Sequence, residues 1–417
     1  MRKALLAALL LFSLSFAMAG ETIRVVANVH PWTDGMKSLI PEFEKETGIK
    51  VQLETYAEDQ LNQKVSVEFT ASKGRGIDVF CTRPPQEGRM MAKNGWYQDL
   101  TPYFKDDADY DFADFTPGSI DGTFIDGIQT AIPLVTEVEL LFYRKDILEA
   151  KGLKPPKTFE ELEAMAKQLH DPAKGMSGFV ARGQRSALIT QFSSYLYGFG
   201  SDFFDLKTQK SLVDTPEFKK AANFYGGMLH KYGPEGVLNM HWMQAVAVFT
   251  QGKAALYTEA SSLYPSLLDP TKSALADQTG VAVFPKGPAG HHTYDITAWA
   301  LAMSSGSSKK DAAWKFIRFM TNKKNTIVTQ GKFMNPCARQ STYKIPEGVA
   351  NFPPDWVQAM AESSTIGIGR DRPAVTAVGE ARDIIGEVVV AAIEGKDIEP
   401  VAKRAHERFQ EILDREK

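Results

Sequence analysis

Short apolar runs and longer amphipathic stretches alternate along the first part of the chain. Residues 23–27 form an apolar, β-branched run and residues 49–53 alternate between apolar and polar side chains, so both are predicted to be strands. Apolar positions at helical spacing over residues 35–47 predict a helix that stops at Gly48. Pro41 lies inside that stretch and predicts either a kink or a late start of the helix.

A second helix and a third strand continue the same pattern. Leu61, Val65 and Phe69 recur at helical spacing in a polar stretch, and residues 77–81 form an apolar run typical of a buried strand. Strand, helix, strand, helix and strand in this order are typical of a parallel sheet covered by helices. The predicted fold class is therefore α/β.

Later segments carry clearer signals for the ends of helices. Thr158 and Glu161 form a capping box that opens a predicted helix, and Ser308 with Asp311 is predicted to open another. Residues 400–414 are predicted to close the chain as a helix. A length of 417 residues predicts two or three domains, and without a long Pro/Gly/Ser linker we expect several chain crossings between them.

The first residues of the chain indicate a signal for export rather than part of the folded protein. Two basic residues after Met1 precede an apolar stretch over residues 4–16, and an A-x-A cleavage site ends at Ala19. We expect residues 1–19 to be a signal peptide cleaved near Ala19, and a periplasmic location for the rest. No later run approaches the ~18 apolar residues of a membrane span.

Composition narrows the classes of function further. The chain has 48 Lys plus Arg against 51 Asp plus Glu, a formal charge of −3, and 43% of its residues are hydrophobic. This balance gives no whole-molecule attraction to nucleic acid and argues against a disordered chain. A bridge between the two cysteines, Cys81 and Cys337, is possible in principle, but we expect two buried or semi-buried free thiols.

Motifs for catalysis and cofactors are mostly absent. There is no phosphate-binding GxxxxGK[ST] loop and no GxSxG nucleophile turn, and residues 367–372 lack the third glycine of a dinucleotide fingerprint. The pair His291-His292 lacks further metal ligands at fixed spacing, so we expect no metal and no cofactor. Carboxylates are plentiful, and a glycosidase pair therefore stays open at this point.

Four stretches carry a resemblance to a known family. They are residues 42–51, residues 131–133 with the segment 141–146, residues 249–256 and residues 309–317. In this order and at this spacing the chain resembles the extracellular solute-binding proteins of ABC importers, the family that includes maltose-binding protein.

The resemblance implies a two-lobe periplasmic-binding fold of the type II kind, with parallel-rich sheets and flanking helices. Hinge strands join the lobes, which close over one ligand in a cleft at the hinge. By the resemblance, lobe 1 is residues 21–134 plus 292–335 and lobe 2 is residues 135–291 plus 336–417. A membrane permease is the implied protein partner, and a monomer is expected.

Ligands rich in hydroxyl groups need planar polar side chains and aromatic faces. His30 and Trp32 follow the first strand, where the family supplies polar contacts, and Arg83 follows the third strand. Packing of Trp32 within lobe 1 and a surface ion pair for Arg83 are the alternatives. Gln60, early in the second predicted helix, is a further candidate.

Glu137 falls on a family position whose glutamate binds sugar hydroxyls, and a hinge ion pair is its alternative. Asp295 and Trp299 match a family loop in which the tryptophan stacks on the ligand, and a position in the core is the alternative for Trp299. Glu259 opens a turn in which the family often has a stacking Trp, but this chain has Ser262 there. That departure favours a ligand smaller or more polar than a maltodextrin.

Further candidates follow from the resemblance, and they are Glu139, Gln184, Thr190, Arg339 and Arg372. Both arginines could instead hold loops through hydrogen bonds to the backbone.

The expected function is therefore capture of a small neutral carbohydrate without chemistry: a mono- or disaccharide, a glycoside or a sugar alcohol. One alternative is an anionic sugar derivative, either a sugar acid or a phosphorylated polyol. Four arginines could serve it, and they are Arg83, Arg339, Arg370 and Arg372. Four acidic residues expected near the same cleft argue against it, and they are Glu137, Glu139, Glu259 and Asp295. A less favoured alternative is a secreted glycosidase that uses two of those carboxylates.

Overall fold

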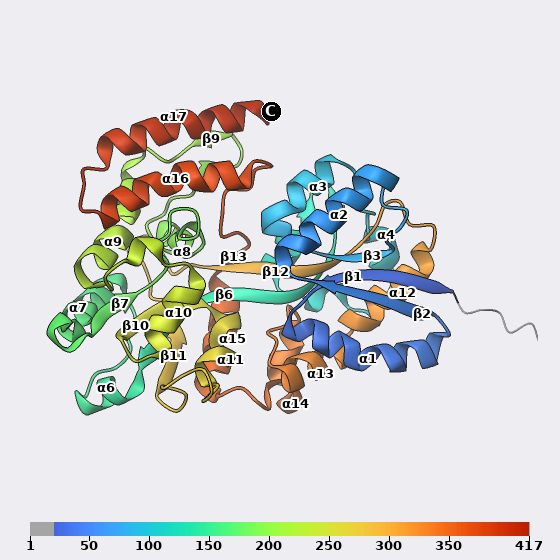
Figure 1. Ribbon diagram of the computed structural model, residues 1–417, viewed down its shortest axis with the longest axis horizontal. Coiled ribbons are helices and arrows are strands. Elements are labelled where there is room, and N and C mark those ends of the chain that lie inside the picture. Colours follow the sequence, from blue (N-terminus) through green and yellow to red (C-terminus); the bar gives the residue numbers. More distant parts are fainter. Residues whose placement is uncertain (1–20, 417) are drawn as a thin grey trace, which may run out of the picture.

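The structure is a computed structural model that describes residues 21–416 (Figure 1). The signal peptide expected at residues 1–19 lies outside the described residues. Among the described residues, no helix has both the length and the apolar character needed to cross a bilayer.

One continuous sheet of nine strands runs through both lobes in the order β2-β1-β3-β12-β6-β10-β7, with β11 beside β6 and β13 beside β12. The two longest strands, β6 and β12, pair antiparallel and lie across the middle of the molecule (Figure 1). The strands of this sheet are β1 (Thr22–Asn28), β2 (Lys50–Tyr56), β3 (Val79–Thr82), β6 (Ile132–Arg144), β7 (Ser177–Val180), β10 (Ala254–Ala260), β11 (Thr279–Val283), β12 (Thr293–Met303) and β13 (Gly367–Ile368). Two small hairpins lie apart from it, β4 (Phe124–Ile125) with β5 (Ile128–Gln129) and β8 (Phe204–Asp205) with β9 (Lys210–Ser211).

Lobe 1 is built on β1, which pairs parallel with both β2 and β3. Helices α1 and α13 lie on one side of this sheet and α2 and α3 on the other (Figure 1). Phe43 of α1 packs edge-on against Phe316 at 5.3 Å between ring centroids, and Phe69 of α2 stacks on Trp96 at 4.9 Å. The helices of this lobe are α1 (Pro31–Thr47), α2 (Glu58–Ser72), α3 (Arg89–Lys93), α4 (Thr101–Phe104), α5 (Pro117–Thr123), α12 (Lys310–Thr321) and α13 (Lys323–Phe333).

Lobe 2 packs helices on both faces of β7, β10 and β11. Helices α8, α9, α16 and α17 form the larger core, and α10, α11 and α15 form the smaller one on the other face. The helices of this lobe are α6 (Lys145–Ala150), α7 (Phe159–Leu169), α8 (Ile189–Gly198), α9 (Pro216–Tyr232), α10 (Trp242–Thr250), α11 (Tyr264–Leu268), α15 (Pro354–Ile366), α16 (Val378–Ile393) and α17 (Glu399–Arg415). The short helix α14 (Pro346–Val349) packs against α13.

Most of the predicted elements form, with two differences at helix starts. The helix predicted over residues 35–47 begins earlier, at Pro31, because His30 accepts a hydrogen bond from the Trp32 amide as its N-cap. It then runs through Pro41 to a left-handed Gly48, so the predicted late start is wrong. The predicted cap at Ser308 is also wrong, because α12 begins at Lys310 without a side-chain cap.

Residues just after the expected lobe boundary at residue 336 contact lobe 1. Ala338 accepts a hydrogen bond from the Thr116 amide at 2.8 Å, and Arg339 bridges to Phe115 of lobe 1. Residues 336–339 therefore pack with lobe 1. The expectation of free thiols is confirmed, because Cys81 and Cys337 are both buried and unbridged.

Candidate ligand-binding site

Polar side chains from both lobes meet beyond the carboxyl ends of four strands. Arg83 follows β3 in lobe 1, while Arg182 follows β7 and Glu259 lies near the end of β10 in lobe 2. His30 follows β1. Because open α/β sheets bind ligands at this edge, these residues mark the candidate site between the lobes.

The lobe 1 side of the site combines a cation with aromatic rings. The Arg83 guanidinium lies 5.5 Å from the centre of the Trp299 ring, and its Nε donates to Glu87 at 3.3 Å. The ring of His30 lies 6.3 Å from that of Trp299. Burial lowers the pKa of His30 to about 4 despite the charge of nearby Asp34, so this imidazole is neutral at pH 7.

A bulge in β12 places Trp299 at the hinge. The pairing of β12 with β6 shifts register between Thr297 and Ala300, so Ala298 faces no partner residue. Such a bulge redirects the side chains beside it. Trp299 is 6% exposed, and the surface it offers a ligand is correspondingly small.

On the lobe 2 side, Arg182 and Glu259 form a buried pair of hydrogen bonds. Arg182 donates from Nε at 2.9 Å and from Nη2 at 2.5 Å to the two Glu259 oxygens, and Gln191 of α8 donates to the same carboxylate. Burial disfavours the charged form of Arg182, but the adjacent carboxylate outweighs it and raises its pKa. Glu259 is fully buried and holds Arg182 in place.

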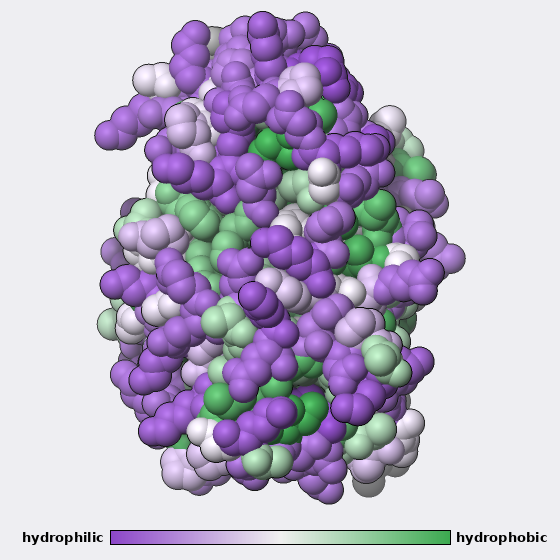
Figure 2. All heavy atoms as spheres, turned by 90° about the vertical axis from the view of Figure 1, so that its left-hand side faces the viewer, coloured by the Kyte–Doolittle hydropathy of each residue, from purple (hydrophilic) through white to green (hydrophobic). Residues whose placement is uncertain are grey.

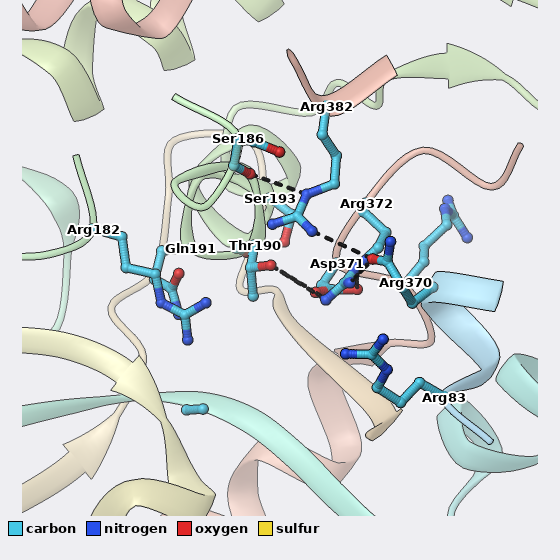
Figure 3. A network of polar contacts seen from close by, with 12 residues as sticks. Arg83, Arg182, Ser186, Thr190, Gln191, Ser193, Arg370, Asp371, Arg372 and Arg382 are labelled. Carbon is cyan, nitrogen blue, oxygen red and sulfur yellow. Dashed lines mark hydrogen bonds and ion pairs between the residues drawn. The ribbon is translucent and has the colours of Figure 1, made fainter. Parts of the chain in front are cut away.

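A second acid–base pair lies beside it, in the loop before α16. Arg372 donates to Asp371 from Nε at 2.8 Å, and the Thr190 hydroxyl donates to the other Asp371 oxygen at 2.9 Å (Figure 3). Burial works against ionisation of Asp371, yet Arg372 and Arg382 hold the pKa of its carboxyl below its usual value. The pair is therefore fixed as two charges.

Arg382, on α16, has no carboxylate among the hydrogen-bond partners seen in the described chain. Its Nε donates to the Ser186 carbonyl at 3.0 Å (Figure 3). Its Nη1 reaches Gln86 Oε1 at 3.4 Å. Burial, together with the charge of Arg372, lowers its pKa to about 9. Arg382 thus stays charged at pH 7 and retains donor capacity in the site.

The hinge supplies one carboxylate with remaining acceptor capacity. Glu137 lies on β6 and accepts from the Ser262 hydroxyl at 2.5 Å. Burial raises its pKa, and the charges of Glu259 and Asp371 add to this effect while Arg182 opposes it. A carboxylate that accepts one neutral hydrogen bond can accept others from ligand hydroxyls.

Two further acids on the hinge strands are buried away from the space between the lobes. Glu139 is 0% exposed, neither of its oxygens has a well-formed hydrogen bond, and burial raises its pKa well above its usual value. Asp295 is 1% exposed and accepts from the Thr136 hydroxyl at 2.6 Å, and burial raises its pKa to about 6. Their surroundings make each carboxyl harder to ionise than one exposed to solvent.

Comparison with known proteins decides the family. A family model described as a bacterial extracellular solute-binding protein matches residues 30–327. The chain belongs to this family.

Relatives within the solute-binding family cover most of the chain. A mannitol-binding protein of Pseudomonas aeruginosa is 30% identical over 84% of this chain and 77% of its own length. An erythritol/L-threitol-binding protein of Mycolicibacterium smegmatis is 27% identical over 78% of this chain and 72% of its own. Among solved structures, an ABC transporter solute-binding protein from Agrobacterium radiobacter K84 in complex with ribitol has a TM-score of 0.80 and 27% identity, and covers 94% of this chain and 98% of its own. The expected two-lobe periplasmic-binding fold is confirmed.

Of the residues expected to bind the ligand in this solute-binding protein, two are buried within lobe 1. Trp32 is 3% exposed and packs in the core of lobe 1, which was its alternative. Arg339 is fully buried and donates to the backbone carbonyls of Tyr110, Asp111 and Thr321, so it holds loops together instead of reaching the cleft. Gln60 on α2 and Gln184 before α8 are both exposed to solvent, and their contact with a ligand stays a prediction.

The structure brings the other expected residues together around the hinge: His30, Arg83, Glu137, Thr190, Glu259, Trp299 and Arg372. Glu139 and Asp295 lie beneath them, within the hinge. Sequence reasoning missed Gln86, Arg182, Gln191, Asp371 and Arg382. Arg182 could have been predicted, because it follows a strand as Arg83 does. Gln191 and Arg382 reach the site because α8 and α16 pack there, and no local sequence pattern indicates that packing. In the described part of the chain, no three His, Cys, Asp or Glu side chains gather in a metal-binding arrangement.

Proposed function

We propose that this protein is the periplasmic binding component of an ABC importer, and that it captures a small neutral open-chain polyol by closure of its lobes. The observation that carries this proposal is how the arginines near the site are paired. Arg83 faces Glu87, Arg182 faces Glu259 and Arg372 faces Asp371. Each of these guanidinium charges is already balanced by a carboxylate of the protein.

The same pairing weakens the case for an anionic ligand, because only Arg382 among the described arginines of the site lacks a carboxylate partner. That alternative relied on Arg83, Arg339, Arg370 and Arg372, but Arg370 pairs with Asp202 and Arg339 is buried in lobe 1. Among the described residues, Arg382 as a donor and Glu137 as an acceptor both have capacity for a ligand. Hydroxyl groups both donate and accept, so a neutral polyol satisfies both.

The scarcity of aromatic faces favours an open chain over a pyranose ring. Sugar rings offer apolar C–H faces that aromatic side chains cover. In this site Trp299 is nearly buried, Trp32 lies in the core, and Ser262 stands where a stacking ring was expected. The relatives named for mannitol and erythritol, and the relative bound to ribitol, agree with a ligand of this class.

Transport then needs partners that the family implies. We infer that the loaded protein delivers its ligand to a membrane permease driven by a separate ATPase, without chemistry of its own. Figure 2 shows polar side chains over most of the outer end of lobe 2, with apolar ones in small separate groups. This end of lobe 2 therefore offers no large apolar face for self-association, in keeping with the expected monomer.

Calorimetric titration of residues 20–417 tests the proposal. The panel is mannitol, ribitol and erythritol, with maltose, gluconate and a hexitol phosphate as comparisons. We expect a dissociation constant in the micromolar range, about −8 kcal/mol, for at least one alditol. Binding of gluconate or the phosphate alone would overturn the neutral-ligand proposal, and turnover of an aryl glycoside would overturn the absence of catalysis.

A further inference from the structure

A single carboxamide of lobe 1 touches two arginines of lobe 2. Gln86 lies in the short helical turn η1 (Pro84–Gly88) that follows β3. Its Oε1 accepts from Arg372 Nη1 at 2.6 Å and lies 3.4 Å from Arg382 Nη1. Both contacts cross from one lobe to the other, and both end on the same oxygen.

The chemistry leaves one orientation for this carboxamide. Guanidinium groups only donate hydrogen bonds, so the carboxamide NH2 group cannot replace Oε1 against Arg372 and Arg382. A hydrogen bond from a charged donor is stronger than one between neutral groups. Gln86 therefore makes a directional contact with lobe 2.

The two arginines are held from their own side. Asp371 fixes Arg372 through Nε and Nη2, and the Ser186 carbonyl fixes Arg382 through Nε. The Nη1 atom of each guanidinium is thereby left pointing at Gln86. Neither arginine can follow Gln86 if the lobes separate, so opening breaks these contacts.

Open space lies on both sides of this contact. Gln86 lines a pocket of about 160 Å³ together with Phe124 and Leu206, and a second pocket of about 440 Å³ together with Arg83 and Gly379. Residues of both lobes line each pocket. Gln86 therefore bridges the lobes between two open spaces, and its side chain contributes directly to their closure.

We propose that Gln86 is a positioning residue that ties the lobes in the closed state and orients Arg372 and Arg382 toward the ligand. The effect on ligand affinity rests on the proposed function, whereas the effect on lobe closure does not. Gln86 sets how long the closed state lasts rather than which ligand enters.

Two substitutions at this residue test the proposal in opposite directions. Gln86→Leu keeps the size but removes the acceptor, and we expect ligand to dissociate about tenfold faster. Gln86→Glu places a carboxylate against both guanidinium groups, and we expect dissociation about tenfold slower. Stopped-flow fluorescence with the alditol found by titration measures both rates.

The distance between the lobes in the ligand-free protein distinguishes the two roles, because loss of a simple ligand contact would not change it. Spin labels on Lys93→Cys in lobe 1 and Lys403→Cys in lobe 2 report it, because both sites are exposed and the native thiols are buried. The ligand-free population should shift toward the open distance in Gln86→Leu and toward the closed distance in Gln86→Glu. The matched control, Gln168→Leu on the exposed face of α7, should leave both measurements unchanged.

Two outcomes would overturn the proposal. One is faster dissociation in both variants with unchanged ligand-free distances, which would make Gln86 a ligand contact. The other is a ligand-free distance distribution that is the same in all variants. Failure of the unmodified protein to bind any alditol would instead contradict the proposed function, and the ligand-free distances would still decide the role of Gln86.

Discussion

Glu137 lies at the hinge, and its carboxylate has remaining capacity to accept hydrogen bonds. Its one side-chain hydrogen bond in the described structure comes from Ser262 at 2.5 Å. We expect Glu137→Gln to weaken alditol binding by about ten- to a hundredfold, because a hydrogen bond to a charged group contributes about 1.5–3 kcal/mol. Calorimetric titration measures the loss.

The control for this substitution is Glu235→Gln, on an exposed loop of lobe 2. It removes the same charge far from the hinge and should leave the affinity within twofold. Equal affinities for Glu137→Gln and the unmodified protein would exclude Glu137 from the ligand contacts.

The burial of Asp295 predicts how the stability of the protein depends on pH. Burial raises its pKa to about 6, above the ~3.9 of an exposed aspartate, so the native state binds this proton more tightly than the unfolded state does. Its contribution to the free energy of unfolding is complete below about pH 4 and is lost as the pH rises through 6. Asp295→Asn has no charge to bury, so its stability relative to the unmodified protein should rise by up to about 3 kcal/mol from pH 4 to pH 7.

Urea unfolding of both proteins across this pH range measures the difference, in which the other titrating groups cancel. A difference that does not vary with pH would show that burial does not raise the pKa of Asp295 above that of the unfolded chain.

Local sequence rules could place only some of the site residues. His30, Arg83 and Glu137 were predictable because strand ends and hinge crossings have local patterns. Trp32 and Arg339 were misplaced because chain position alone does not decide whether a large side chain turns into its own lobe. In the structure the Arg339 guanidinium packs 4.2 Å from the centre of the Phe115 ring, a contact between residues far apart in sequence.

At the scale of elements, two neighbouring glycines in α9 make a matched pair. A Cβ on Gly226 would lie 2.4 Å from the Ala392 Cβ and 2.9 Å from backbone atoms of α16, whereas a Cβ on Gly227 would meet nothing within 4 Å. We expect Gly226→Ala to lower the free energy of unfolding by about 1–3 kcal/mol, because the two helices must move apart.

Gly227→Ala should instead raise stability by up to about 1 kcal/mol, because alanine is the better helix former. Chemical denaturation of the two variants checks the opposite signs. The same direction of change in both would mean that helix propensity, rather than the contact between α9 and α16, controls this region.

The elements themselves were largely predictable, and the exceptions have physical causes. Strands β1, β2 and β3 have clear apolar patterns, and the Thr158 cap of α7 forms as expected with the Glu161 amide at 3.2 Å. The start of α1 was misjudged because Pro31 is well tolerated in the first turn of a helix. Pro41 further along does not stop the helix, which buries Leu39 and Phe43 on either side of it.

At the scale of the whole molecule, the two buried thiols report global opening. Burial raises the pKa of Cys337 to about 12 and also raises that of Cys81, so neither forms a reactive thiolate in the native state. We expect no reaction with a thiol reagent at pH 8 until the protein unfolds.

Ligand should slow that reaction further. At a concentration a hundredfold above its dissociation constant, ligand stabilises the native state by about 2.7 kcal/mol. This should slow the modification of the thiols by close to a hundredfold. Reaction followed by absorbance, with and without the alditol, measures the change. Fast modification of the native protein would contradict the burial of these thiols.

The path of the chain also decides how much of it must be present before the sheet can be completed. Strand β3 ends at Thr82, but its neighbour β12 spans Thr293–Met303, so more than 200 further residues must emerge before the two can pair. Until then the edge of the first sheet is open, and open edges attract other chains. We therefore expect chains that stop before β12 to aggregate, and both lobes to finish folding only when the last third of the protein has been made.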